Sequence, residues 1–430
     1  MNKINIGIIG LGTVGAAVAA TLKKNAQVIA EQAGVQIKVK RVCDVRRISS
    51  PYPLTHDPMV LINDPEIDVI VEAIGGLEPA RKLVLAALRA GKHVVTPNKE
   101  LIAKALGELL PAADANGVCL LFEGAVGGGI PILNTIRDNL AANEINEIYG
   151  IVNGTTNYIL SKMTAEGWEF ADALKAAQKL GYAEADPKAD IEGYDASYKA
   201  TILASLAFGV KVSWEDVYRE GIEKITAEDI QFAGEIGYVV KLLAIAKKKD
   251  GEVEVRVHPA LVAKSHPLAN VADNNNAIYL KGSPVGELMF YGPGAGGGPT
   301  ASAVISDLIS IAKGCGGEEC GSDCGCDHDE CCSPAVAGKK LALRPIAETT
   351  SRYYIRLQAA DKHGVLAGIS KAFADKKVSI AAVTQKENLG HQATIVILLH
   401  NVEERNLRSA LKVISRLPMV KKIGNVIRIL

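Results

Sequence analysis

The sequence predicts an α/β protein built from three folds in series: a Rossmann-type N-terminal domain, an α+β middle domain with a mixed sheet, and a C-terminal ferredoxin-like βαββαβ module. The first prediction rests on a repeated order of apolar strand, glycine-rich turn and helix. The second rests on a change to separate helices and strands, with strands near 252–262, 277–280 and 288–291. The third rests on the order strand, helix, strand, strand, helix, strand over 349–430.

These patterns set the expected boundaries. The first domain covers 1–133 and is completed by a helix at about 300–313, which is expected to return to it. The middle domain covers 134–299, a cysteine-rich linker 314–348, and the last module 349–430. A chain of 430 residues is long enough for two or three separate cores.

Composition narrows the range of partners. The 48 basic residues balance 48 acidic ones, and no basic run is interleaved with aromatic residues, so we expect no nucleic-acid partner. No signal-like segment is evident, and no apolar run reaches membrane-spanning length. The expectation is a cytoplasmic protein that acts on small molecules and has no membrane partner.

The first strand runs into a glycine-rich turn within INIGIIGLGTVGAAVAATLKK. Gly10 permits a tight turn, Gly12 allows backbone to approach a pyrophosphate at the helix N-terminus, and Gly15 lets the helix pack closely on the strand. This order predicts dinucleotide binding, and the alternative is a glycine-rich turn in another α/β unit. The cofactor-binding residues assigned to this turn are Gly10, Gly12, Thr13, Val14 and Gly15.

The end of the second strand bears on the choice of cofactor. Asp44 stands where an acid accepts a hydrogen bond from the adenosine ribose 2′-hydroxyl of NAD. Arg46 and Arg47 follow at once, and either could instead hold the 2′-phosphate of NADP. Both cofactors therefore remain open.

Ligands of open α/β sheets sit outside the carboxyl ends of the strands. By that rule Gly75, Gly76, Asn98 and Lys99 would face the cofactor, although Lys99 could also be an exposed lysine at a helix start. A later glycine run at 294–298, which includes Gly296, is another place where backbone can approach the ligand.

Glu123 opens a loop with few side chains, because Gly124 and 127–129 follow it. The carbonyl groups of this loop could bind a hard cation. Alternatively, the lack of side chains could simply make room for a ligand, and composition favours this second interpretation.

The stretch 181–209 concentrates acids ahead of an apolar helix. Asp195 and Lys199 are four residues apart, so they lie on one helical face if the helix begins near Asp195. Gly209 supplies a helix stop, and beyond it we expect a helical segment over 211–249. The alternative is an acidic loop with a surface ion pair.

An earlier helix start, Asn153 to Thr155, offers backbone N–H groups that suit a carboxylate.

Together these motifs resemble those of homoserine dehydrogenases. They are GLGTVG, VVTPNKELIA, FEGAVGGGIPI, NGTTNYIL, GYAEADPKADIEGYDASYKATILA and YGPGAGGGPTASAVISD, in that family's order over roughly 1–313. The resemblance implies NAD(P)-dependent interconversion of L-homoserine and L-aspartate 4-semialdehyde, on the route to threonine and methionine.

The resemblance also implies roles for residues. Lys199 matches the catalytic lysine that donates a proton, and Lys99 matches the lysine near the nicotinamide. Glu184 and Asp195 match the acids that hold homoserine, and Asp190 matches a supporting acid, which we assign to the catalytic group. The substrate site is further assigned Gly154, Thr155 and Tyr182. Some members bind a sodium ion at positions that match Glu123, Val126, Gly128 and Ile130.

The last module resembles an ACT domain in its strand-to-helix turn, 361–366, with His363 where proline is usual. Such domains bind regulatory amino acids, so feedback by threonine or another pathway product is expected. The alternative is a dimerising module without a ligand. Pairing surfaces in the middle domain and in this module favour a homodimer or larger homo-oligomer.

The segment CGGEECGSDCGCDHDECC has no counterpart in the family. Its thiols and imidazole could hold a soft metal, but it lacks a repeated C-x-x-C and has few apolar residues. We therefore favour a solvated loop without a fixed metal. The candidate ligands are Cys315, Cys320, Cys324, Cys326, His328, Cys331 and Cys332.

Two other functions stay open beside the dehydrogenase. A non-catalytic sensor would keep nucleotide and amino-acid sites, and it is disfavoured because both lysines and both substrate acids of the family are present. A dehydrogenase of another amino-acid aldehyde would keep the chemistry and change the substrate.

Overall fold

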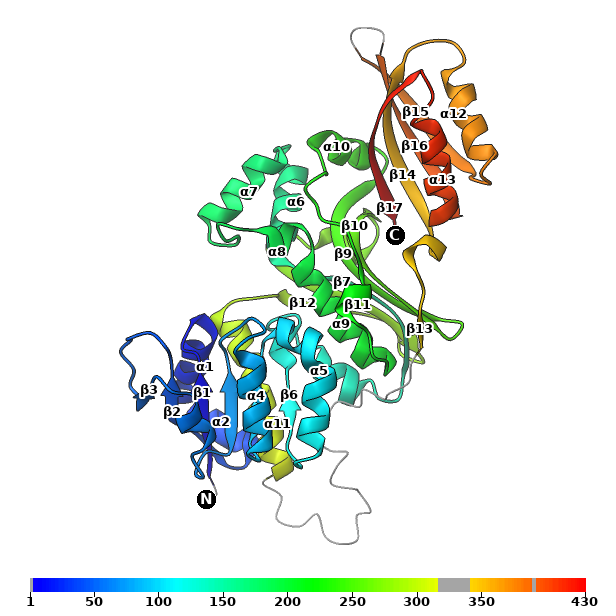
Figure 1. Cartoon of the computed structure of the whole chain (residues 1–430). Helices are drawn as coiled ribbons and strands as arrows, with labels where there is room; N and C mark the ends of the chain where they lie inside the picture. Colours follow the sequence, from blue (N-terminus) through cyan, green and yellow to red (C-terminus); the bar gives the residue numbers. More distant parts are fainter. Residues whose placement is uncertain (1–2, 316–340, 389–391) are drawn as a thin grey trace. The chain divides into compact units, whose positions relative to one another are not determined.

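The computed structural model describes residues 3–315, 341–388 and 392–430 (Figure 1). The chain divides into two compact units. Unit 1 comprises 1–148, 198–216 and 276–341, and unit 2 comprises 149–197, 217–275 and 342–430.

Unit 1 contains a parallel sheet in the strand order β3-β2-β1-β4-β5-β6, which is the order of a Rossmann domain. The predicted fold of the N-terminal domain is therefore confirmed. Its strands are β1 (Lys3–Ile9), β2 (Gln36–Cys43), β3 (Leu54–Thr55), β4 (Val69–Glu72), β5 (His93–Val95) and β6 (Leu120–Leu121). Its helices include α1 (Thr13–Lys24), α2 (Ala26–Ala33), α3 (Met59–Ile62), α4 (Ala80–Arg89), α5 (Lys99–Asp114) and α11 (Gly297–Cys315).

Helix α11 packs against the N-terminal domain although it follows β1 at a great distance along the chain. Its apolar face places Ala301, Val304 and Leu308 in one buried cluster with Ile6 and Val18. The close approach begins at Gly297, where a Cβ would lie 3.0 Å from the carbonyl oxygen of Thr13. A glycine at this position therefore lets the start of α11 press against the start of α1.

Unit 2 contains a mixed sheet and the C-terminal module. Strand β10 pairs antiparallel with β9 and parallel with β17, and the order then continues through β14 and β16 to β15. Its strands are β8 (Tyr218–Arg219), β9 (Tyr238–Lys249), β10 (Glu252–Ala263), β13 (Ala342–Leu343), β14 (Thr350–Ala360), β15 (Ile380–Asn388), β16 (Gln392–Glu403) and β17 (Val420–Ile429). Its helices include α6 (Gly154–Glu166), α7 (Phe170–Lys179), α8 (Lys188–Ile191), α10 (Ala227–Glu235), α12 (Val365–Ala374) and α13 (Glu404–Ile414).

Three further strands and one helix complete the middle of the chain. They are β7 (Glu144–Ile151), β11 (Asn275–Ser283), β12 (Gly286–Pro293) and α9 (Tyr194–Phe208). Helix α9 ends directly before Gly209, whose φ of +61° is the left-handed conformation that stops a helix.

One expectation for this region is wrong. The segment 211–249 is not continuously helical, because 238–249 forms β9, paired along its length with β10. The run YVVKLLAIA is apolar and short, and such a run suits a buried strand as well as a helix. Pairing with β10 favours the strand over the helix, and such pairing cannot be predicted from a local pattern of residues.

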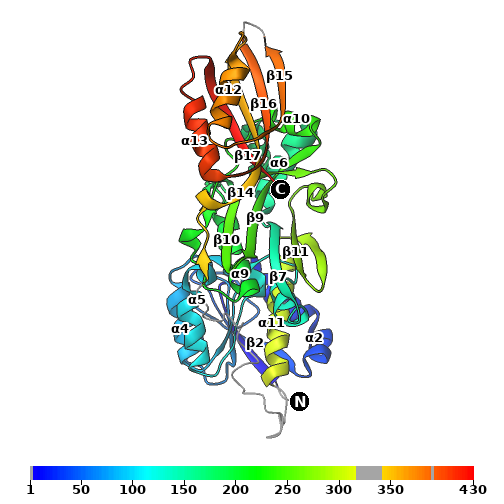
Figure 2. The same cartoon turned by 90° about the vertical axis from the view of Figure 1, so that its right-hand side faces the viewer.

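The C-terminal module has the order β14-α12-β15-β16-α13-β17, which confirms the predicted βαββαβ fold. Helices α12 and α13 cover one face of its sheet (Figure 2), and Phe373 and Leu407 pack with Ile355 and Ile397 in its core. Since β17 also pairs with β10, the module continues the sheet of the middle domain.

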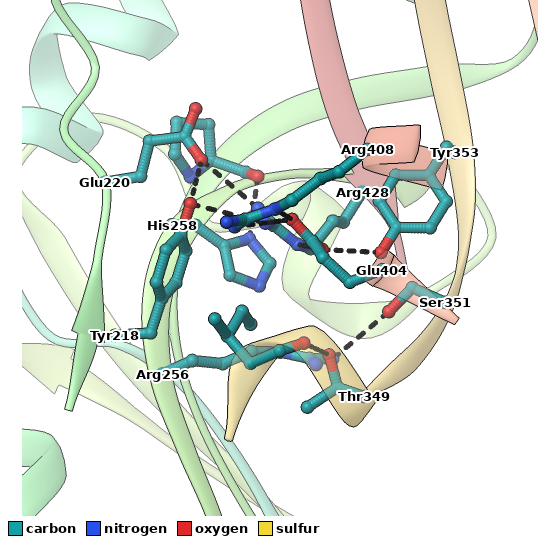
Figure 3. A network of polar contacts seen from close by, with 12 residues as sticks. Tyr218, Glu220, Arg256, His258, Thr349, Ser351, Tyr353, Glu404, Arg408 and Arg428 are labelled. Carbon is teal, nitrogen blue, oxygen red and sulfur yellow. Dashed lines mark hydrogen bonds and ion pairs between the residues drawn. The ribbon is translucent and has the colours of Figure 1, made fainter. Parts of the chain in front are cut away.

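A buried polar network joins the module to the middle domain within unit 2 (Figure 3). Arg428 of β17 donates to both Glu404 carboxylate oxygens, at 3.0 and 2.7 Å, and to Glu220 at 3.1 Å. The Tyr353 hydroxyl donates to Glu404 at 2.7 Å.

A second buried ion pair also joins the module to the middle domain. Arg356 of β14 donates to both Asp229 oxygens, at 2.6 and 3.1 Å, at the start of α10. The junction is therefore held by buried ion pairs as well as by strand pairing.

Candidate active site

The turn between β1 and α1 has little room for side chains. Gly10 has φ +97°, and a Cβ there would lie 2.6 Å from the carbonyl oxygen of Ala73. A Cβ on Gly15 would lie 1.9 Å from the carbonyl oxygen of Gly10. By contrast, nothing lies within 4 Å of a Cβ built on Gly12, the N-cap of α1. The helix start, with Thr13 and Val14 in its first turn, is therefore open to a ligand on that side.

Asp44 and Arg46, which suggest two different cofactors, form one ion pair. Asp44 is buried, and its Oδ2 accepts the Leu11 N–H at 2.8 Å. Arg46 donates its backbone N–H and Nε–H to Oδ1, each at 2.9 Å, and its Nη2–H to Oδ2 at 2.9 Å. Hydrogen bonding by the Arg46 side chain holds the pKa of the Asp44 carboxyl below its usual range. Both oxygens of the acid thus accept hydrogen bonds from the protein itself.

A buried glutamate that the sequence reasoning missed organises the ends of β4 and β5. Glu72 accepts N–H bonds from Ile74 at 2.7 Å and Gly75 at 3.2 Å, and its other oxygen accepts the Thr96 hydroxyl at 2.6 Å. The only sequence signal is an acid that closes the apolar run IDVIVE. Its contacts fix the glycine loop at which the cofactor is expected.

Asn98 connects this loop to α5. Its Nδ2 donates to the carbonyl oxygen of Gly76 at 2.7 Å, and its Oδ1 accepts the Leu101 N–H at 3.1 Å as the helix N-cap. Lys99 is the first residue of α5 and is exposed. Asn98 and Lys99 thus lie just beyond the carboxyl end of β5, as the sequence predicts.

In unit 2, Asn153 brings two of the predicted acids together. Its Nδ2 donates to Asp190 Oδ1 at 2.7 Å and to Asp195 Oδ2 at 2.9 Å. Its Oδ1 accepts the Thr156 N–H at 2.8 Å and caps α6. One amide therefore links the N-terminus of a helix to two carboxylates 37 and 42 residues further along the chain.

The start of α6 is also tied to the loop that follows α7. The Thr155 hydroxyl donates to the carbonyl oxygen of Tyr182 at 2.6 Å, and a Cβ on Gly154 would lie 2.6 Å from the carbonyl oxygen of Asn274. The Tyr182 ring meets the Tyr158 ring edge-on, with 5.1 Å between centroids. In the same loop, Glu184 is exposed.

Helix α9 carries both Asp195 and Lys199, about one helical turn apart. The two residues are only 5% and 7% exposed, respectively. This burial argues against a surface ion pair, because charged side chains are seldom buried without a defined role or partner. Lys188 of the same stretch is exposed.

Two of the four residues expected to bind sodium, Glu123 and Ile130, have oxygens that already accept hydrogen bonds from the protein. The Glu123 carboxylate accepts the Leu133 N–H at 3.0 Å and the Asn134 N–H at 2.6 Å, and the Ile130 carbonyl oxygen accepts the Ile132 N–H at 2.9 Å. Val126 and Gly128 are buried in the same loop. The hydrogen bonds of Glu123 and Ile130 therefore give no support to a sodium ion here.

Glu123 instead lies against a second buried acid. Its backbone N–H donates to Asp307 Oδ2 of α11 at 2.9 Å. Burial raises the pKa of Asp307 to about 7, and the charge of Glu123 adds to the rise.

Two further predicted site residues, Gly296 and Cys315, lie at the two ends of α11. Gly296 has φ +116° and stands directly before α11, whose start approaches α1. Cys315 ends α11, and the other candidate soft-metal ligands lie outside the described residues. Within the described parts of the chain, no group of three or more His, Cys, Asp or Glu side chains could hold a metal ion, and no helix is long and apolar enough to cross a membrane.

The Rossmann sheet with its open helix start suits a dinucleotide, and the buried lysine and carboxylate on α9 suit proton transfer and substrate binding, a combination typical of nicotinamide-dependent oxidoreductases. Family models agree. The model described as homoserine dehydrogenase matches residues 131–309, and the model for the NAD-binding domain of homoserine dehydrogenase matches 10–123. The ACT domain model matches 353–418, which confirms the resemblance of the last module.

Relatives extend this similarity over the whole chain. The homoserine dehydrogenase of Neisseria gonorrhoeae is 43% identical over 434 residues, which cover 100% of this chain and 99% of the relative. That of Synechocystis is 43% identical, with 99% of each chain covered. The crystal structure of a homoserine dehydrogenase from Thiobacillus denitrificans has a TM-score of 0.94 at 42% identity and covers 100% of this chain and 99% of its own. The chain belongs to the homoserine dehydrogenase family, and its predicted class, an NAD(P)-dependent oxidoreductase, is confirmed.

Proposed function

We propose that this chain interconverts L-homoserine and L-aspartate 4-semialdehyde, with Lys199 as the group that exchanges the proton of the substrate oxygen. The observation that carries the assignment is the burial of Asp195 and Lys199 on one face of α9. A bound nicotinamide supplies hydride transfer at its C4. The protein must then bind the amino acid, orient its reacting carbon and move one proton.

The acids of unit 2 suit the ammonium group of the substrate. Asp195 and Glu184 would accept its N–H bonds, and Asp190 would support Asp195 through their shared donor, Asn153. The substrate carboxylate suits the N-terminus of α6 at Gly154 and Thr155, where backbone N–H groups and the helix dipole favour an anion.

The lysines suit the substrate oxygen. In the direction of aldehyde reduction, the oxygen gains negative charge as hydride arrives, and the Lys199 ammonium gives it a proton. Lys99 would be the second cation near this oxygen. A neighbouring positive charge lowers the pKa of an ammonium group, which brings proton transfer nearer to neutral pH.

The Asp44–Arg46 pair supports use of both cofactors. Arg46 neutralises the acid that would otherwise repel a 2′-phosphate, and its side chain is 58% exposed, so it can also turn towards that phosphate. The Asp44 carboxylate, once released, can accept from the 2′-hydroxyl of NAD. Among similar structures, a hyperthermophilic archaeal homoserine dehydrogenase is in complex with NADPH.

We further propose that the ACT domain binds a regulatory amino acid. Gly364, with φ +82°, precedes α12, and the turn 361–364 is exposed. Threonine, a downstream product, is the first candidate for this ligand. A homodimer or larger assembly, acting in the cytoplasm, is part of the same proposal.

One assay tests these proposals. Purified protein is given aspartate 4-semialdehyde with NADPH or NADH, and oxidation is followed by absorbance with and without threonine. We expect turnover with both cofactors and a lower rate with threonine. No turnover with this aldehyde, but binding of nucleotide and threonine, would indicate a sensor; turnover only with another amino-acid aldehyde would change the substrate.

A further inference from the structure

Asn153 has every hydrogen-bonding position of its side chain in use. The two Nδ2 hydrogens go to Asp190 and Asp195, and Oδ1 accepts from the backbone N–H and the hydroxyl of Thr156, at 2.8 and 2.9 Å. The residue is 5% exposed. Since an amide has two donors and one acceptor oxygen with two lone pairs, this set is complete.

The contacts also determine which way the amide points. A reversed amide would aim its oxygen at two carboxylates and its hydrogens at the Thr156 N–H, so the bonds to both acids and to the cap would be lost together. The observed orientation gives both carboxylates a donor from one atom. Donors of this kind favour the ionised form of an acid and fix its direction.

The backbone beneath Asn153 is fixed as well. Asn157, one turn further along α6, donates to the carbonyl oxygens of Val271, Asp273 and Asn275 at 3.1, 2.9 and 3.1 Å. The start of α6 is therefore held against the loop 271–275 of the same unit. A side chain anchored in this way can set the position of its partners rather than follow them.

We propose that Asn153 is the positioning residue of the substrate site: it holds Asp190 and Asp195 together so that Asp195 meets the substrate ammonium in one orientation. This inference rests on the proposed function, because it assumes that Asp195 binds substrate. It assigns no contact between Asn153 and the reacting atoms. Loss of the Asn153 side chain is therefore expected to weaken substrate binding through the two acids.

The test compares Asn153→Ser with Thr156→Val in the full chain. Serine still accepts the N–H that caps α6, but its single, shorter O–H replaces two N–H donors, so it cannot hold both acids at once. Valine removes the Thr156 hydroxyl bond and leaves both Nδ2 bonds. We expect Asn153→Ser to raise KM for homoserine by about tenfold or more, with KM for the nucleotide unchanged. Thr156→Val should change KM for homoserine by less than about threefold while lowering thermal stability.

A third variant separates positioning from a general loss of fold. Asn153→Asp keeps the capping oxygen but places a new carboxyl against two others. Because the three carboxyl groups then share protons, the acid limb of the pH profile of kcat/KM for homoserine should move to higher pH. An unchanged KM and pH profile in Asn153→Ser and Asn153→Asp would overturn the proposal. If wild-type protein has no activity towards homoserine, the proposed function itself fails; if wild type is active and the Asn153 variants behave as wild type, the positioning role alone fails.

Discussion

At the scale of single residues, Lys241 is a buried ammonium outside the proposed site. Its Nζ, on β9, donates to Asn157 Oδ1 at 3.1 Å and to the Val271 carbonyl oxygen at 2.5 Å. Burial lowers the pKa of this ammonium from 10.5 to about 8, against a smaller opposing effect of Asp273.

This shift predicts a pH dependence of stability. Between about pH 8 and 10.5 the unfolded chain keeps the Lys241 proton and the folded chain releases it, so the free energy of unfolding rises with pH in that window. The full rise from this group is on the order of 3 kcal/mol. Lys241→Met should lose it, and denaturant unfolding at several pH values would measure the difference from wild type. If the free energy of unfolding changed equally with pH in the two proteins, Lys241 would not titrate in this range.

Residues differ in how far their surroundings can be predicted from the chain alone. The spacing of Asp195 and Lys199 is sufficient to predict a shared helical face, because helical geometry is local. The role of Asn153 cannot be predicted in the same way, since its partners lie 37 and 42 residues away and no periodic pattern connects them. Glu72 escapes sequence reasoning for the same reason, because its hydroxyl partner Thr96 follows the next strand.

At the scale of elements, the glycine turn and the terminal βαββαβ order can be predicted because each follows from a continuous pattern. Strand β9 cannot, since its apolar run suits either helix or strand until β10 pairs with it. The pairing of β17 with β10 is also beyond sequence reasoning, because it joins segments far apart along the chain.

That junction leads to a prediction about its ion pairs. Arg428 and Glu404 are each 6% exposed, so Arg428→Met leaves a buried carboxylate with fewer donors. We expect the free energy of opening of the β17 amides, measured by hydrogen exchange, to fall by about 3 kcal/mol. Arg408 also contacts Glu404 but is 51% exposed, and Arg408→Met should cost less than about 1 kcal/mol. Similar losses in the two variants would argue against a dominant buried pair.

At the scale of the whole molecule, three successive modules are predictable because each has its own pattern, and the family models match parts of all three. Contacts between segments far apart along the chain are harder to predict. Helix α11 returns to the first domain, and β17 extends the middle sheet into the ACT domain. Of these two features, only the return of α11 is predicted from the sequence, because its glycine run suggests a second approach to the cofactor.

The most direct test concerns Lys199, the proposed proton donor. Lys199→Ala should lower kcat by about 10² to 10⁴, the usual contribution of a general acid, while nucleotide binding and thermal stability stay near wild type. Lys188→Ala, an exposed lysine of the same stretch, is the matched control and should keep its activity. We expect a large loss of turnover in the first variant alone. A Lys199→Ala enzyme whose kcat remains within about threefold of wild type would contradict this expectation.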